Sequence, residues 1–339
     1  MEERSLEEYE ATDLHAARKA FSRLGIAAFV MLVVTYGLQI LVGVAAGYAN
    51  IRNAVVLLLI SYIPMYCIAF PAAYFIMRAV PRHPLERQSL GAGRFFRLIV
   101  ICFFLMYGGN LFGSSVNSLI SEMFGVSITD PVESLVLGDI PMPALFVLTV
   151  ILAPFFEELM FRKLLIDRMN VYGQGTAVVT TALMFGLFHG NLSQFFYAMA
   201  LGLVFGYVYV KTGKMRYSVC MHMIINFWGG IVSGTLITDE SVQTLINGGL
   251  GLENIEDMPS LITPSVVLFM LYAMVTLGLV VAGLVLFFRH RRRISLETSE
   301  LQIPKGQAFR TVWLNAGMIL FTLACFAMML ITIFKDLLL

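Results

Sequence analysis

The stretch PALFVLTVILAPFFEELMF, residues 143–161, is long and apolar enough to cross a lipid bilayer, yet it carries two adjacent glutamates near its end. A membrane-crossing helix needs about 20 predominantly apolar residues. Further apolar segments lie on both sides of this stretch, at residues 24–48, 54–80, 98–119, 175–190, 194–210, 217–237, 264–288 and 312–334. The sequence therefore predicts an all-α, polytopic transmembrane bundle of about nine membrane helices, with the segments at 175–190 and 194–210 short.

The composition supports a membrane protein. Of the 339 residues, 58% are apolar and 13% are charged, whereas soluble domains average about 45–50% and about 25%. The first apolar run is longer than the 7–15-residue core of a signal peptide, so we expect it to be retained. The net charge of +1 gives no reason to expect a nucleic-acid partner, and membrane lipids are the expected surroundings of the basic residues.

The distribution of basic residues predicts the orientation, because basic loops stay in the cytoplasm. With the N-terminus inside, the inner segments 1–23, 78–97, 162–168, 211–216 and 289–310 leave only Arg52 and Lys335 of the 23 basic residues outside. The two long outer loops contain no Lys or Arg and carry the acids Glu122, Asp130, Glu133, Asp139, Asp239, Glu240, Glu253, Glu256 and Asp257. We therefore expect a multi-pass cell-membrane protein with a cytoplasmic N-terminus and an external C-terminus.

The two outer loops also suggest how the chain is divided. We expect a cytoplasmic head at 1–23, an N-terminal three-helix unit with its outer loop at 24–142, a functional core at 143–237, and an outer loop with a C-terminal helix pair at 238–339. The core is singled out because it holds every acid and histidine found inside the apolar segments. Ionisable groups are expensive to keep in a membrane and usually mark function.

Three ionisable residues of this core, Glu157, Glu158 and Arg162, lie close together in the sequence. Glu158 and Arg162 are four residues apart, so they share a helix face and are expected to form an ion pair that lowers the cost of both charges. Glu157 points about 100° away and is expected to stay without a permanent counter-ion, which suits a general base for water. A purely structural clamp or an interfacial anchor is the alternative for this stretch taken alone.

The other polar groups come from two later segments. His189 follows Phe185 near the end of one short segment, and His222 and Asn226 share a face of another, where both side chains can donate hydrogen bonds to one developing oxyanion. At about 1.5 Å of rise per residue, the three segments bring these groups to similar depths near mid-bilayer. This meeting requires the hairpin 190–193 to turn within the membrane, where other parts of the protein must cover its backbone.

In their order, the motifs Glu-Glu-x-x-x-Arg, Phe-x-x-x-His and His-x-x-x-Asn resemble the CPBP family of intramembrane proteases, which includes CAAX prenyl endopeptidases and Abi bacteriocin-processing proteins. The resemblance covers residues 143–237. It implies that Glu157 and His189 activate the hydrolytic water, that His222 and Asn226 hold the oxyanion, and that Glu158 and Arg162 support the site. It also implies a hydrophobic or lipidated peptide substrate.

The sequence favours no cofactor. The chain lacks the His-Glu-x-x-His pair of zinc proteases, and its cysteines, Cys67, Cys102, Cys220 and Cys325, form no CxxC pair. Zinc remains possible, with Glu157, His189 and His222 as ligands and water in the fourth position. We favour a glutamate-activated water without metal, because the His222 and Asn226 pair fits an oxyanion hole better than a ligand set.

The leading hypothesis is an intramembrane endopeptidase that cleaves membrane-associated or lipid-modified peptides. The substrate is a leader, signal or toxin peptide if the organism does not prenylate proteins. A non-catalytic immunity or scaffold protein that binds a bacteriocin-like peptide or another partner is the second hypothesis. A proton-coupled transporter is the third, weakened by the absence of an inverted repeat in the sequence.

Overall fold

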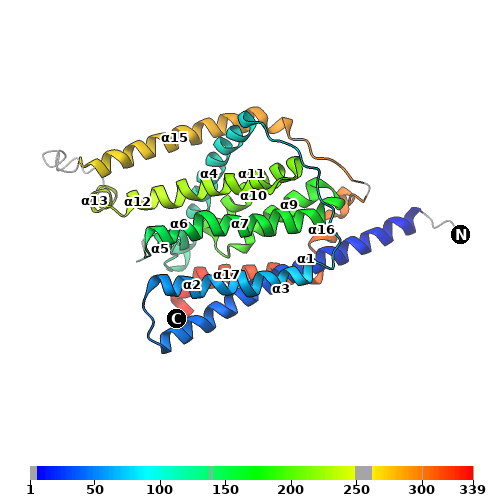
Figure 1. Ribbon diagram of the computed structural model, residues 1–339, viewed down its shortest axis with the longest axis horizontal. Coiled ribbons are helices and arrows are strands. Elements are labelled where there is room, and N and C mark those ends of the chain that lie inside the picture. Colours follow the sequence, from blue (N-terminus) through cyan, green and yellow to red (C-terminus); the bar gives the residue numbers. More distant parts are fainter. Residues whose placement is uncertain (1–5, 137, 139, 249–261, 300, 339) are drawn as a thin grey trace.

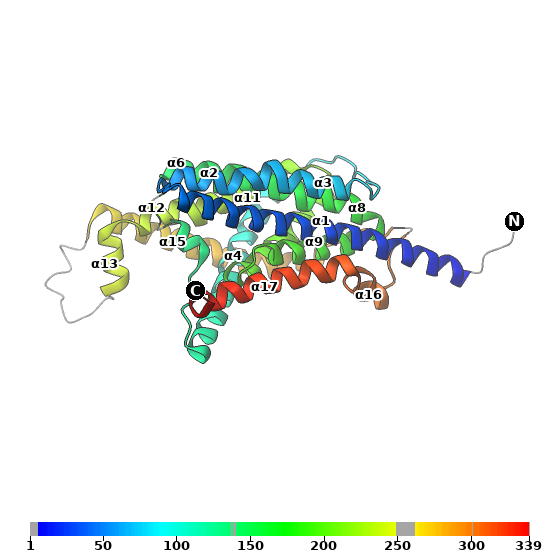
Figure 2. The same ribbon diagram turned by 90° about the horizontal axis from the view of Figure 1, so that it is seen from below.

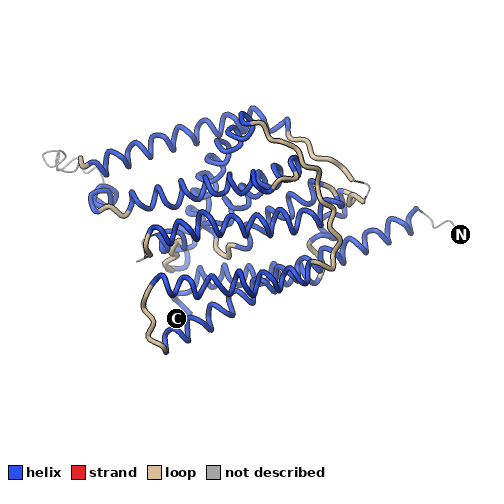
Figure 3. Tube along the Cα trace, in the orientation of Figure 1, coloured by secondary structure: helices blue, strands red, loops and turns tan. Residues whose placement is uncertain are grey.

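The structure is a computed structural model that describes residues 6–136, 138, 140–248, 262–299 and 301–338. The acids Asp139, Glu253, Glu256 and Asp257, predicted to lie in outer loops, fall outside these described residues. Within them, every regular element is helical (Figure 3). The all-α prediction is therefore confirmed.

The first half of the bundle begins with one very long helix. Its elements, in order, are α1 (Leu6–Tyr48), α2 (Ala54–Pro64), η1 (Met65–Ala69), α3 (Phe70–Met77), α4 (Ala92–Phe124) and α5 (Pro131–Val136). Most of the charged head of the chain is thus helical and continues without a break into the first apolar segment.

The remaining elements contain the predicted core and the C-terminal helices. They are α6 (Met142–Phe146), η2 (Val147–Leu152), α7 (Ala153–Glu158), η3 (Leu159–Ile166), α8 (Asp167–Met169), η4 (Asn170–Tyr172), α9 (Gln174–Phe188), α10 (Leu192–Thr212), α11 (Met215–Asn226), η5 (Phe227–Val232), α12 (Ser233–Ile237), α13 (Glu240–Gly248), α15 (Pro264–His290), η7 (Arg291–Arg293), η8 (Lys305–Gln307), α16 (Ala308–Val312) and α17 (Ala316–Leu338).

Eight helical segments among the described residues are long and apolar enough to cross a membrane. The ninth predicted segment is α9, which has 15 residues and so spans only about 22 Å at about 1.5 Å per residue. A hydrocarbon core is about 30 Å thick. Eight of the about nine predicted membrane helices therefore have the required length, whereas α9 is helical but too short to cross alone.

Helices α1 and α17 pack together, and α15 packs on α4 at the opposite edge of the bundle (Figure 1). The two C-terminal helices are therefore separated by the rest of the molecule. Between these edges, α10 packs against both α4 and α9. The helices of the predicted core thus lie in the middle of the bundle.

The loops predicted to be inner gather at one end of the bundle, the end where α1 begins (Figures 1 and 2). The backbone amide of Gln88 donates to the carbonyl of Thr212 at 2.8 Å, and the amide of Gln174 donates to the carbonyl of Glu297 at 3.3 Å. α17 ends at the other end of the bundle (Figure 1). This grouping of the basic loops was predicted from the sequence.

Four stretches of the bundle are π-helical: η1, η2, η3 and η5. η1 begins directly after Pro64, and η2 ends two residues before Pro154. Proline lacks the amide that would bond to the carbonyl four residues earlier, and its ring crowds that carbonyl. A wider turn relieves the crowding, and such turns occur frequently at functional sites.

Candidate active site

The centre of the site is a fully buried ion pair between Glu158 and Arg162. Arg162 Nε donates to Glu158 Oε2 at 3.0 Å, and neither side chain is exposed. The guanidinium carbon lies 5.1 Å from the ring centroid of Phe185 and 5.9 Å from that of Phe205. Aromatic faces attract a desolvated cation, so the two rings help to hold the charge. The predicted pairing is confirmed.

His222 lies between the two adjacent glutamates. Its Nδ1 is 3.2 Å from Glu158 Oε1, and its Nε2 is 3.7 Å from Glu157 Oε2. Because a carboxylate only accepts hydrogen bonds, Nδ1 carries the proton toward Glu158. The 3.7 Å separation on the other side exceeds a direct hydrogen bond and leaves room for a shared water or a substrate oxygen.

The two glutamates differ in access. The Glu158 side chain is 0% exposed, whereas the Glu157 side chain is 28% exposed. The expectation that Glu157 has no permanent counter-ion stays a prediction, because His222 forms an ion pair with it only when the imidazole is protonated. The approach of His222 to Glu157 follows from the packing of α11 against α7, which the spacing of residues along one helix does not show.

His189 lies directly after α9, and its ring contacts the Phe185 ring. Its Nδ1 donates to the carbonyl of Phe185 at 2.8 Å, so Nε2 is the acceptor atom of the ring in its neutral form. Its ring centroid is 4.9 Å from that of Phe185, and the His222 ring is 5.8 Å from the same centroid. In this part of the chain, which the structure describes, His189 makes no hydrogen bond or ion pair with Glu157.

Asn226 ends α11 and ties it to the helix that carries the glutamates. Its Nδ2 donates to the carbonyl of Thr149, in η2, at 2.8 Å. One of its two amide hydrogens is thereby used, and the other stays available to a ligand. Asn226 and His222 share a helix face, as predicted, but Asn226 has a structural bond of its own.

The hairpin between α9 and α10 is covered by protein, as the sequence analysis required. The Thr332 hydroxyl shares its hydrogen between the carbonyls of Met328, at 3.0 Å, and Gly190, at 3.2 Å, and Asn191 Nδ2 donates to the carbonyl of His189 at 2.9 Å. Gly190 has a φ of 65°, and Asn191 and Ser193 are buried. A left-handed residue without a Cβ is needed here. The hairpin therefore holds His189 with its backbone satisfied.

The potential zinc ligands do not assemble. Among the residues that the structure describes, no three His, Cys, Asp or Glu side chains gather closely enough to hold a metal ion. Nδ1 of His222 faces Glu158, and Nδ1 of His189 faces its own helix. Both Nδ1 contacts are also the usual outer bonds of histidines that ligate a metal through Nε2, so zinc binding by Glu157, His189 and His222 stays a prediction for metal analysis.

The sequence analysis did not single out Phe205, Tyr62 or Tyr66 as residues near the site. Phe205 lies in an ordinary apolar segment, and only the packing of α10 on its neighbours brings its ring to His222 at 5.3 Å. The sequence did contain a pattern that could have indicated Tyr62 and Tyr66. They are four residues apart in the second apolar segment, so their hydroxyls share one helix face.

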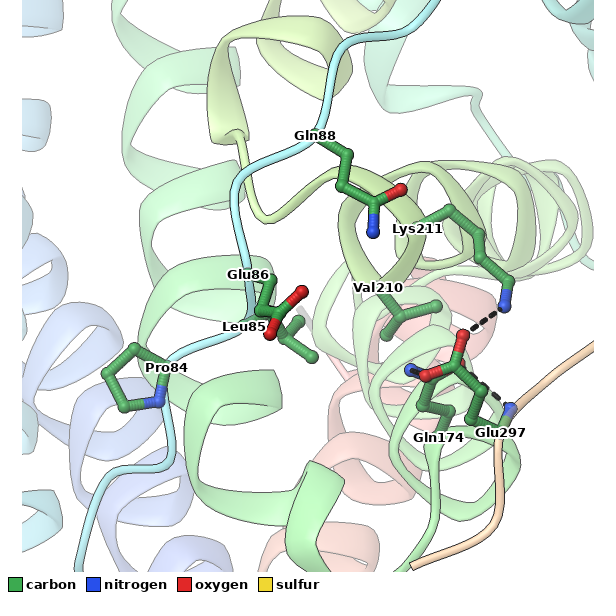
Figure 4. Close-up of a pocket in the computed structure, with 8 residues that line it drawn as sticks. All are labelled: Pro84, Leu85, Glu86, Gln88, Gln174, Val210, Lys211 and Glu297. Carbon is green, nitrogen blue, oxygen red and sulfur yellow. Dashed lines mark hydrogen bonds and ion pairs between the residues drawn. The ribbon is translucent and has the colours of Figure 1, made fainter.

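A separate polar cavity of about 320 Å³ opens at the end of the bundle where the basic loops gather (Figure 4). It is lined by Pro84, Leu85, Glu86, Gln88, Gln174, Val210, Lys211 and Glu297. Lys211 Nζ donates to Glu297 Oε1 at 2.8 Å, and this bond keeps the pKa of the Glu297 carboxyl below its ordinary value. None of the predicted site residues lines this cavity, so it is distinct from the site around Glu157.

Comparison with known proteins covers the same part of the chain. Residues 140–228 match the family described as type II CAAX prenyl endopeptidase Rce1-like. Over 190 residues, the chain is 24% identical to the candidate membrane peptidase YdiL of Bacillus subtilis (strain 168), an alignment that covers 52% of this chain and 75% of the relative. No solved structure matches the chain. The matched range contains Glu157, Glu158, Arg162, His189, His222 and Asn226.

Proposed function

We propose that the chain, whose residues 140–228 match the Rce1-like family of CAAX prenyl endopeptidases, hydrolyses peptide bonds with a water activated by Glu157. One observation carries the proposal: His222 contacts both a sealed and an accessible carboxylate, at 3.2 Å and 3.7 Å. The buried carboxylate, Glu158, fixes the orientation of the His222 ring. The partly exposed carboxylate, Glu157, is accessible to water and substrate.

In the proposed reaction, Glu157 accepts a proton from a water molecule while the water oxygen forms a bond to the carbonyl carbon of the peptide. The carbonyl becomes a tetrahedral oxyanion. When the C–N bond breaks, the carboxylic acid of Glu157 returns the proton to the leaving amine, so that the carboxylate is regenerated. Each proton and each bond is thus accounted for by the substrate, one water and one carboxylate.

The other site residues support these steps. Glu158 holds Nδ1 of His222, so Nε2 points to the space beside Glu157, where a protonated ring donates to the oxyanion. We assign the free amide hydrogen of Asn226 to the same oxygen. The unprotonated Nε2 of His189 is proposed to accept a hydrogen bond from the water and orient it. Arg162 compensates the buried charge of Glu158.

The proposed substrates are membrane-associated peptides. The family name points to peptides that end in a prenylated CAAX sequence, and leader, signal or toxin peptides are the alternatives. We further propose that the end of the bundle with the basic loops faces the cytoplasm, because basic loops remain there. Reporter domains fused to the N-terminus and to the C-terminus test this orientation by their activity on each side of the membrane.

The catalytic proposal is tested with the purified full-length protein and two internally quenched peptides ending in CAAX, one prenylated and one not. Glu157→Gln keeps the size of the side chain and removes the base, so kcat is expected to fall at least about 10²-fold. Glu86→Gln is the matched control, because Glu86 is exposed in the separate cavity near the basic loops, which no predicted site residue lines. Cleavage by Glu157→Gln at the rate of the unmodified protein would show that Glu157 is not the base.

The same assay separates hydrolysis from simple binding. If the unmodified protein binds the prenylated peptide with no cleavage at all, the non-catalytic scaffold hypothesis replaces the enzyme. If it cleaves only the unprenylated peptide, the reaction stands and the proposed substrate class is wrong.

A further inference from the structure

The hydroxyl of Tyr66 is buried without a hydrogen-bond partner. Four buried side-chain polar atoms in the described part of the chain share this property: Thr35 Oγ1, Tyr66 OH, Asn117 Oδ1 and Arg162 Nη1. Leaving a buried donor unsatisfied costs about 1–3 kcal/mol. Most buried polar groups in proteins have a partner, and an exception calls for an explanation.

Aromatic contacts bring Tyr66 to the helix of the active site. The Tyr66 ring stacks on Phe156 with centroids 4.2 Å apart and planes inclined by 22°. Phe70, one turn further along, meets the same Phe156 ring edge-on at 5.5 Å. Phe156 directly precedes Glu157. The rings of Tyr66 and Phe70 thus both pack against Phe156, the residue before the proposed base.

The charge of Glu157 also acts on the tyrosines of this helical segment. The carboxylate of Glu157 interacts electrostatically with the hydroxyls of both Tyr62 and Tyr66. Tyr66 lies in η1, a π-helical stretch, and π-helical turns are frequent at functional sites. The unsatisfied hydroxyl therefore belongs to the surroundings of Glu157, although it comes from the N-terminal part of the chain, outside residues 140–228.

Hydrolysis needs donors for the oxyanion, and apart from Nε2 of His222 and the second amide hydrogen of Asn226, assigned above, most donors near Glu157 have partners. Nδ1 of His222 faces Glu158, and one amide hydrogen of Asn226 is bonded to Thr149. The Tyr66 hydroxyl is a donor without a hydrogen-bond partner. Preorganised donors of this kind stabilise the charge that develops in the transition state.

We propose that Tyr66 donates its hydroxyl hydrogen to the carbonyl oxygen of the scissile peptide bond and holds it as the oxyanion forms. This inference rests on the proposed function and adds to it a substrate-contacting residue from η1. The bond is made only when substrate is present, which accounts for the missing partner in the free protein.

The test is Tyr66→Phe, which removes the hydroxyl and keeps the ring that stacks on Phe156. Loss of one oxyanion donor lowers kcat by about 10²–10³-fold in a well-studied protease, and we expect a loss of at least about 10-fold here, with KM changed less than kcat. The unfolding temperature should stay the same or rise, because the variant no longer buries an unsatisfied donor. Tyr74→Phe is the control: it removes a hydroxyl from α3, two turns further along the same helical segment.

The outcomes are distinct. If the unmodified protein fails to cleave the prenylated CAAX peptide, the proposed function falls, and this inference falls with it. If the unmodified protein cleaves the peptide and Tyr66→Phe cleaves it equally fast, only the role of Tyr66 is wrong. A lower unfolding temperature for Tyr66→Phe, not seen for Tyr74→Phe, would also overturn the proposal, since it reveals a structural partner for the hydroxyl.

Discussion

Glu158 and Arg162 form an ion pair at 3.0 Å in which neither side chain has any exposed surface. The effect of such a pair on the free energy of unfolding depends on whether one partner or both are replaced. Replacing both partners by apolar residues is often neutral or stabilising, whereas removing one leaves an uncompensated charge at a cost of about 3–5 kcal/mol. This asymmetry leads directly to a stability test.

Arg162→Met is expected to lower the free energy of unfolding by about 3–5 kcal/mol, measured by denaturant unfolding in detergent micelles. The double variant Glu158→Leu with Arg162→Met should recover a large part of this loss. Arg82→Met is the comparison, since its partner Asp167 keeps Lys163 at 2.8 Å and Tyr209 at 2.7 Å. Equal losses in the single and double Arg162 variants would contradict the analysis.

Glu158→Gln should reduce catalysis by releasing the His222 ring. A neutral amide no longer enforces a proton on Nδ1, and the wrong imidazole tautomer costs a serine protease about 10⁴ in kcat. We expect a fall in kcat of at least about 10²-fold with little change in KM, measured by steady-state cleavage of the CAAX peptide. A change confined to KM would show that Glu158 acts on substrate binding instead.

Gly317→Ala should weaken the packing of α17 on α1. A Cβ at Gly317 would clash with the carbonyl of Ser22, and small residues allow such close approach of membrane helices. Overpacking of this kind costs about 1–3 kcal/mol, detectable as a lower unfolding temperature. Gly278→Ala in α15 meets no atom within 4 Å and should not lower it. Equal behaviour of the two variants would contradict the close crossing.

Metal removal gives a prediction that separates two mechanisms. Because the possible ligands do not gather in the described structure, we expect dialysis against a strong chelator to leave peptide cleavage unchanged. Metal content measured by mass spectrometry accompanies the assay. Activity that is lost on chelation and restored by zinc would show that Glu157, His189 and His222 rearrange around a metal.

The pair of Lys211 and Glu297 predicts a small pH effect. The pKa of Glu297 is lowered, first because Lys211 donates to its carboxylate. The contribution to stability is therefore present above the ordinary glutamate pKa of about 4.3 and is lost as the pH falls through the lower value of the folded protein. The unfolding temperature of Glu297→Gln should lie below that of the unmodified protein at pH 7, with the gap narrowing below about pH 4. A constant gap would contradict this linkage.

Most of the fold was readable from the sequence because apolar length alone decides whether a segment spans a membrane. The Glu158 and Arg162 pair was equally readable, since residues four apart on one helix must share a face. The gathering of the basic loops at one end also followed from the distribution of charge. These predictions use only information that is local or statistical.

The partners of Glu157 and Asn226 were not readable. His222 reaches Glu157 because α11 packs against α7, and Asn226 bonds to a backbone carbonyl at Thr149, which leaves no trace in the side-chain pattern. The four π-helical stretches change the face that a residue presents, and helical arithmetic with 3.6 residues per turn does not include them. The short α9 was expected to be short, but only the structure shows that it cannot cross alone.

The bond from Thr332 to the carbonyl of Gly190 connects the final long helix to the turn that carries His189. α17 is synthesised after every residue of the candidate active site. A nascent chain that still lacks α17 therefore has no donor from this helix for the carbonyl of Gly190. The turn that carries His189 therefore gains this cover only after α17 has been translated and has packed against it.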